Sequence, residues 1–129
     1  MKKKIAVIAN GWYNRGLTDI MKGITAYTGQ RGIDVFLFLT YSTFRESVEY
    51  NDGEFNIHRL PDYDDYDGVI FIPDSLSSPK EAERLRSEFV KNRIRAVSVG
   101  TPWKVSAMFR ATTMSPCASY ASIWLRSMK

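Results

Sequence analysis

The chain has 129 residues, of which 44% are apolar and 25% are charged, a balance typical of a soluble globular domain with one modest core. Its formal net charge is +4. Residues 1–100 carry 14 basic and 14 acidic side chains, whereas residues 101–129 carry 4 basic and no acidic ones. The whole excess charge therefore lies after residue 100. A nucleic-acid partner is not expected for the first part, because such a partner requires clustered positive charge.

The N-terminus and the cysteine content indicate a protein of a reducing compartment. Cys117 is the only cysteine, which excludes an internal disulfide bond. The opening MKKKIAVIANGW has basic residues before an apolar run, as a signal peptide does, but the run from Ile5 to Ala9 is too short for one. No stretch reaches the length of a transmembrane helix. We therefore expect a cytoplasmic protein without a membrane partner.

Two apolar strands flank the first predicted helix. Residues 4–9 (KIAVIA) and 33–40 (IDVFLFLT) are nearly continuous apolar runs, which are typical of strands covered on both faces. Between them, apolar side chains recur at helical spacing at Leu17, Ile20, Met21, Ile24 and Tyr27. Gly32 is expected to end that helix, because glycine tolerates the left-handed backbone common at helix termini.

The same alternation continues to residue 100. A polar segment after Thr40 is expected to be a loop with a helical start, and residues 54–60 a short helix. Residues 69–73 (VIFIP) and 94–100 (IRAVSVG) are the third and fourth predicted strands. The helix between them is predicted to begin with a capping box and an N-terminal proline, formed by Ser78, Glu81 and Pro79.

Four apolar strands that alternate with helical segments predict an α/β domain over residues 1–100. Its sheet is expected to be parallel, in the strand order 2-1-3-4, with helices on both faces. Ligands of such sheets bind beyond the carboxyl ends of the strands. The residues that follow strands one to three therefore form the predicted ligand site, which consists of Trp12, Tyr13, Tyr41, Ser42, Thr43 and Asp74.

The loop NGWYNRG after the first strand allows two interpretations. Trp12 and Tyr13 can stack on the apolar face of a sugar or a planar ligand, or they can pack against the following helix. The loop lacks the glycine spacing of a dinucleotide-binding turn and the lysine of a P-loop. A flavodoxin-like protein that binds phosphate or flavin in this loop remains an alternative from another functional class.

No catalytic or metal-binding pattern accompanies this loop. The acidic stretch 62–68 (DYDDYDG) has Tyr66 where a calcium loop needs an oxygen ligand and Asp67 where it needs glycine, so a solvated turn is expected. His58 is the only histidine and is expected at the surface or at a helix end. The segment NDGEF does not match the GGDEF signature of diguanylate cyclases. We expect no enzyme, no cofactor and no bound metal.

The order and spacing of these segments resemble a known sensor family. KKIAVIANGW, MKGITAY, GIDVFLFLTYSTF, EFNIHRLPDYDDYDGVIFIP and IRAVSVG together resemble the N-terminal lobe of the periplasmic-binding-protein-like type I sensor domain of LacI-type regulators. The stretch FNIHRLPDYDDYDGVIF resembles a subgroup in which this sensor precedes a GGDEF diguanylate cyclase in one cytoplasmic chain. The resemblance covers residues 2–100 and implies one lobe of a two-lobed sensor for a small, sugar-like effector.

The resemblance leaves two parent proteins open. LacI-type regulators carry a helix-turn-helix segment ahead of this lobe, whereas this sequence begins at the first strand. A sensor lobe of a signalling protein is therefore the first expectation, and an effector-binding fragment of a LacI-type transcription regulator is the second. In both cases the family's second lobe completes the pocket, so residues 1–100 alone are expected to bind an effector weakly.

Residues 101–129 depart from the family pattern, because they show no apolar period and no acidic residue. Reverse translation read two bases downstream converts Trp103-Lys104 to Glu and Met108-Phe109 to Val, which suits the family's next strand and helix. We hypothesise a frameshift near codon 100; a genuine basic arm is the alternative. The fourth strand is then expected to lack an outer neighbour and to promote a homodimer or aggregation.

Overall fold

The computed structural model describes residues 2–12, 14–99 and 113–114. Its strands are β1 (Lys4–Asn10), β2 (Asp34–Thr40), β3 (Gly68–Phe71), β4 (Ala96–Val99) and β5 (Thr113–Met114). Its α-helices are α1 (Asn14–Arg31), α2 (Val48–Glu54) and α3 (Pro79–Lys91). Short 3-10 helices span Phe55–Arg59, Tyr63–Asp65 and Pro73–Ser75.

All strands belong to one sheet with the order β2-β1-β3-β4-β5, and every pairing is parallel. The predicted order 2-1-3-4 is confirmed. In the centre of the sheet, Val7 of β1 lies opposite Leu37 of β2 and Ile70 of β3. Because the strands run in one direction, the loops after β1, β2 and β3 all emerge at the same edge.

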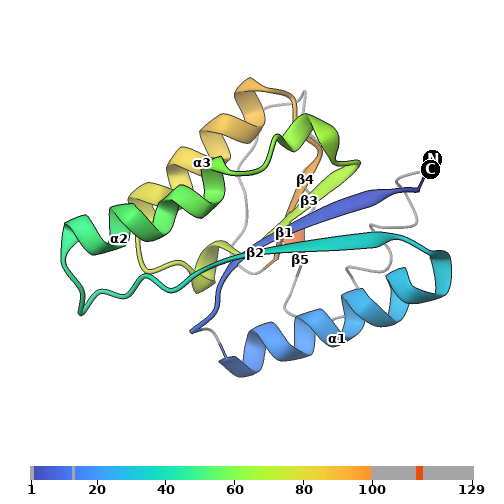
Figure 1. The fold of residues 1–129 in the computed structure, drawn as a ribbon, viewed down its shortest axis with the longest axis horizontal. Coiled ribbons are helices and arrows are strands. Elements are labelled where there is room, and N and C mark those ends of the chain that lie inside the picture. The colour runs from blue at the N-terminus through green and yellow to red at the C-terminus, as the bar shows by residue number, and fades with distance from the viewer. Residues whose placement is uncertain (1, 13, 100–112, 115–129) are drawn as a thin grey trace.

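Helices cover the sheet on both faces (Figure 1). Alternate residues of β1 point to opposite faces. On one face, β1 packs with α1 in a buried cluster that contains Ile5, Val7, Ala9, Leu17, Ile20 and Ile24. On the other face, it packs with α3 in a second cluster that contains Ala6, Ile8, Leu85 and Phe89. The apolar run in β1 is continuous because both faces are covered.

The helix ends follow the sequence signals, with one difference. Gly32 has a φ of 62° and ends α1 as expected. The Ser78 hydroxyl accepts a hydrogen bond from the Glu81 backbone N–H at 3.2 Å, with Pro79 in the first helical position. The Glu81 carboxylate, however, bonds to His58 and Arg84 rather than completing the capping box. The buried His58 from another helix is thus a partner of the Glu81 carboxylate, in place of the Ser78 backbone N–H that a capping box would use.

The expectation that the fourth strand lacks an outer neighbour is wrong. Thr113 pairs with Ser98 and Met114 pairs with Val99, so β5 covers part of the outer edge of β4. Strand pairing uses backbone groups, which any extended segment can supply without an apolar period. The rest of residues 101–129, and with it the frameshift hypothesis, lies outside the described residues. Association of chains through β4 stays a prediction.

Within the described ranges, no helix is long and apolar enough to cross a membrane.

We predict that Phe89→Ala strongly destabilises the domain. The Phe89 ring is fully buried and packs edge-to-face against two other rings. The distance between ring centroids is 5.1 Å to Tyr63 and 5.9 Å to Phe71. Its removal leaves a cavity and should lower the free energy of unfolding by about 3–5 kcal/mol. Urea denaturation followed by circular dichroism measures this change.

The control is Phe44→Ala, because the Phe44 side chain is 84% exposed. Its free energy of unfolding should change by less than about 0.5 kcal/mol. Equal effects of the two substitutions would contradict the placement of Phe89 in the core.

Candidate functional site

A buried amide organises the carboxyl edge of the sheet. Asn10 ends β1 and is only 2% exposed. Its Oδ1 accepts a hydrogen bond from the Trp12 backbone N–H at 2.9 Å. Its Nδ2 donates to the Ser42 carbonyl oxygen at 2.8 Å and to the Ser42 hydroxyl at 3.3 Å. One side chain therefore joins the loop after β1 to the loop after β2.

Serine hydroxyls extend this network to the segment after β3. The Asn10 backbone N–H donates to the Ser75 hydroxyl at 2.9 Å, and that hydroxyl donates to the Ile72 carbonyl oxygen at 2.6 Å. The Ser77 hydroxyl donates to the Ser42 hydroxyl at 2.9 Å. These partly buried hydrogen bonds hold the loops after β1, β2 and β3 relative to one another.

Two exposed aromatic rings lie above this network. Trp12 is 60% exposed and Tyr41 is 44% exposed. The Trp12 indole N–H donates to the Tyr41 carbonyl oxygen at 2.9 Å. The two rings pack edge-to-face, with their centroids 5.6 Å apart. Gly11 makes this arrangement possible, because a Cβ there would overlap the Tyr41 ring. Trp12 is thus fixed in position while most of its side chain faces solvent.

Helix α2 also holds the loop after β2, through hydrogen bonds made by two of its side chains. The Tyr41 backbone N–H donates to the Glu54 carboxylate at 2.9 Å. The Asn51 side chain accepts from the Thr43 backbone N–H at 3.0 Å and donates to the Thr43 carbonyl oxygen at 2.9 Å. Both backbone polar groups of Thr43 are therefore satisfied by one amide, which fixes the course of this loop.

The predicted site residues have different positions at this edge. Trp12, Tyr41 and Asp74 are exposed, and Thr43 is half-buried. Ser42 is only 1% exposed, so it supports the loops and is not available to a ligand. Tyr13 lies outside the described residues. The supporting residues were missed from the sequence, although one signal existed, because Asn10 is a polar residue at the end of a buried apolar strand.

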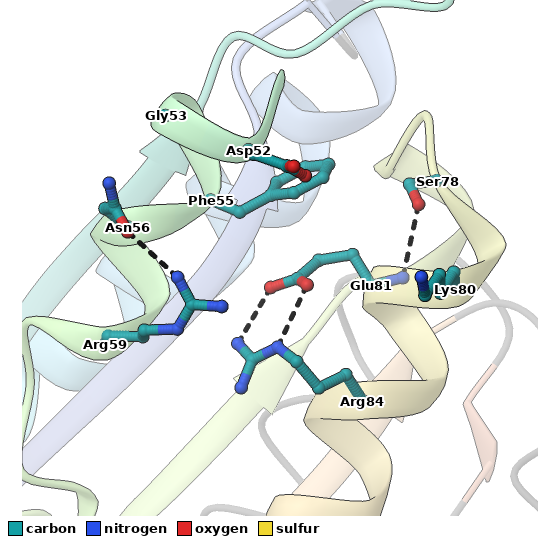
Figure 2. A pocket seen from close by; sticks show the side chains of 9 residues that line it. All are labelled: Asp52, Gly53, Phe55, Asn56, Arg59, Ser78, Lys80, Glu81 and Arg84. Carbon is teal, nitrogen blue, oxygen red and sulfur yellow. Dashed lines mark hydrogen bonds and ion pairs between the residues drawn. The ribbon is translucent and has the colours of Figure 1, made fainter. Parts of the chain in front are cut away.

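A second feature lies between the helices on the α3 face of the sheet. A hollow of about 490 Å³ is bordered by α2 and Phe55–Arg59 on one side and by α3 on the other (Figure 2). Behind it, His58 Nδ1 lies 2.9 Å from Glu81 Oε1. The same carboxylate accepts from Arg84 Nε at 2.9 Å and from its second guanidinium nitrogen at 2.8 Å.

His58 lies in the last turn of its short helix, which is one of the two positions expected for it. It is fully buried, however, and does not lie at the surface. It stacks near Phe55, at 6.0 Å between ring centroids. Burial alone would raise the pKa of the Glu81 carboxyl, but hydrogen bonds from His58 and Arg84 outweigh burial and lower that pKa to about 2. Glu81 is therefore a carboxylate at neutral pH.

In the described part of the chain, no cluster of three or more histidine, cysteine or acidic side chains is placed to hold a metal ion.

We predict that Asn10→Ala weakens the attachment between the loops after β1 and β2 at the carboxyl edge of the sheet. The change leaves the Ser42 carbonyl and the Trp12 N–H without their buried partner, which should cost about 1–3 kcal/mol of unfolding free energy. Hydrogen exchange of the Trp12 indole N–H, followed by NMR, should become faster. Asn56→Ala serves as the control, because Asn56 is exposed and its side chain accepts a hydrogen bond from the nearby Arg59. An unchanged indole exchange rate would contradict the supporting role of Asn10.

We also predict an acid-dependent loss of stability from Glu81. Its pKa in the folded protein, about 2, lies below the ordinary value of 4.5. Glu81 therefore contributes stability above pH 4.5 that is lost as the pH falls toward 2. The contribution is on the order of 3 kcal/mol. Urea unfolding at a series of pH values should show a shallower decline for Glu81→Gln than for the unchanged protein.

Glu83→Gln is the matched control, because Glu83 is exposed on the same helix and lies 3.7 Å from Arg86. Its pH dependence should follow that of the unchanged protein. If the free energy of unfolding fell with pH at the same rate in all three proteins, the lowered pKa of Glu81 would be contradicted.

Known proteins share this fold. No protein-family model matches the chain, and no curated protein matches it. A crystallised fragment of a proposed lipoprotein from Peptoclostridium difficile 630 has a TM-score of 0.69 and 15% identity over 98% of both chains. A response regulator receiver domain protein from Bacillus halodurans C-125 has a TM-score of 0.63 and 13% identity, over 100% of this chain and 98% of its own. These likenesses show a small α/β parallel-sheet fold of the flavodoxin-like, receiver-like kind.

Proposed function

We propose that this chain is the ligand-binding lobe of a small-molecule sensor and acts by binding rather than by catalysis. The observation that carries the proposal is the fixed, exposed ring pair of Trp12 and Tyr41 at the carboxyl edge of the sheet. Exposing a large aromatic ring gives up the free energy of its burial. A ring that is exposed and already held by hydrogen bonds loses little conformational entropy when a ligand binds to it.

The chemistry of this edge suits a neutral, sugar-like effector. The apolar face of a sugar ring can stack on an indole, while its hydroxyls need polar partners nearby. The exposed carboxylate of Asp74 and the half-buried Thr43 belong to the same edge. Residues 1–100 have equal numbers of basic and acidic side chains, which favours a small effector over nucleic acid as the partner of this lobe.

The resemblance to LacI-type sensors over residues 2–100 supports a cytoplasmic signalling role. In that family a second lobe closes over the ligand, so this lobe supplies one wall of the pocket. A fragment of a LacI-type transcription regulator would use the same edge. A flavodoxin-like role would instead place a flavin at residues 10–16, and the absorbance of the purified protein distinguishes it.

We predict weak, localised binding of neutral sugars. Glucose, galactose and ribose are added to the 15N-labelled chain, and backbone amide shifts are followed by NMR. At least one sugar should give saturable shifts with a dissociation constant of about 1 mM or weaker, because one lobe buries only part of a ligand. The shifts should centre on the amides of Gly11, Trp12, Tyr41, Thr43 and Asp74.

Trp12→Ala should remove these shifts and keep the amide spectrum of a folded domain. Phe44→Ala removes another exposed aromatic ring and should leave sugar binding unchanged. Sugar shifts that persist in Trp12→Ala, or that map to another face, would rule out this edge as the effector site.

A further inference from the structure

The hollow on the α3 face is separate from the sheet edge and has its own lining. It is bordered by the end of α2 and residues 55–59 on one side and by the N-terminal part of α3 on the other. None of these residues belongs to the predicted effector site, so the hollow is a different surface from the sheet edge. The walls come from different segments of the chain, which Figure 2 shows facing one another.

Basic groups outnumber acidic groups in this lining. Arg59, Lys80 and Arg84 are basic, whereas Asp52 and Glu81 are acidic. The negative charge of Glu81 is taken up within the wall, because its carboxylate accepts hydrogen bonds from Arg84 and contacts His58. Arg84 is in turn paired with both Glu81 and Glu88, so neither Arg84 nor Glu81 offers a free charge. In the part of the chain that the structure describes, the lining charges that form no ion pair are those of Arg59, Lys80 and Asp52.

Two of the basic groups are not paired with an acid. Arg59 donates to the Asn56 amide oxygen at 2.9 Å, and its guanidinium points toward that of Arg84 across the hollow (Figure 2). Among the described residues, neither Arg59 nor Lys80 forms an ion pair with a carboxylate. A guanidinium bonded to one amide keeps donors free for a planar, two-oxygen acceptor.

We propose that this hollow is a binding site for a small oxyanion, the carboxylate or phosphate group of a low-molecular-weight ligand. Arg59 contacts the anion directly, Asn56 holds the Arg59 guanidinium in position, and Lys80 on the opposite wall adds a positive charge. Phe55 provides an apolar surface beside the charged groups.

The test is an NMR titration of the full chain, labelled with 15N, with inorganic phosphate and separately with succinate. Saturable shifts are expected at the amides of residues 56–59 and 80–84 with at least one probe, and the responding probe identifies the anion as phosphate or carboxylate. Arg59→Gln should weaken binding about tenfold, because it removes a charge-assisted contact. Lys80→Gln should weaken it in the same direction and provides a second, independent variant.

Arg95→Gln is the matched control, since it removes the same charge from an exposed arginine just before β4. It should leave the affinity within about twofold of the unchanged protein. The absence of saturable shifts with both probes would overturn the proposal. Equal losses in the Arg59 and Arg95 variants would also overturn it, because they would indicate general attraction to a charged surface.

Discussion

Strand β1 is buried on both faces and paired on both edges, and the other elements are arranged around it. Ile5 to Ala9 are fully buried, with β2 on one edge and β3 on the other. Burying such a strand requires a helix layer on each side, which α1 and α3 provide. Each large apolar side chain removed from water contributes about 1.5–3 kcal/mol, so burial of β1 together with β3 and β4 holds the covering helices in place.

The same strand also positions the candidate site. Its last residue, Asn10, is the first polar side chain after the apolar run, and it ends where the neighbouring loops meet. A buried amide must satisfy both its donors and its acceptor, so it selects one arrangement of the loops around it. The exposed ring of Trp12 rests on that arrangement through its backbone N–H and its indole N–H. The scaffold therefore supplies rigidity beneath an exposed aromatic surface.

Helix α2 links this edge to the hollow on the α3 face. Asn51 and Glu54 hold the loop after β2, whereas Asp52 and Gly53 border the hollow. The buried pair of His58 and Glu81 joins the segment after α2 to α3. Removing one partner of such a pair leaves a charge or a polar group buried alone, which costs more than the pair contributes as a whole. The two surfaces therefore share one helix as a common wall.

The sequence alone determined the parallel sheet and its strand order, the C-terminal end of α1 and the start of α3. It also determined the sheet edge where Trp12 and Tyr41 lie. These features follow from apolar runs and from Gly32 and Pro79, which act locally. Tertiary structure decided the rest. Ser42 became a support rather than a contact, His58 found Glu81 across 23 positions of sequence, and β5 paired with β4 without an apolar pattern. Such outcomes depend on which polar groups meet in space, and hydrogen-bond partners between distant segments leave no periodic signal in the chain.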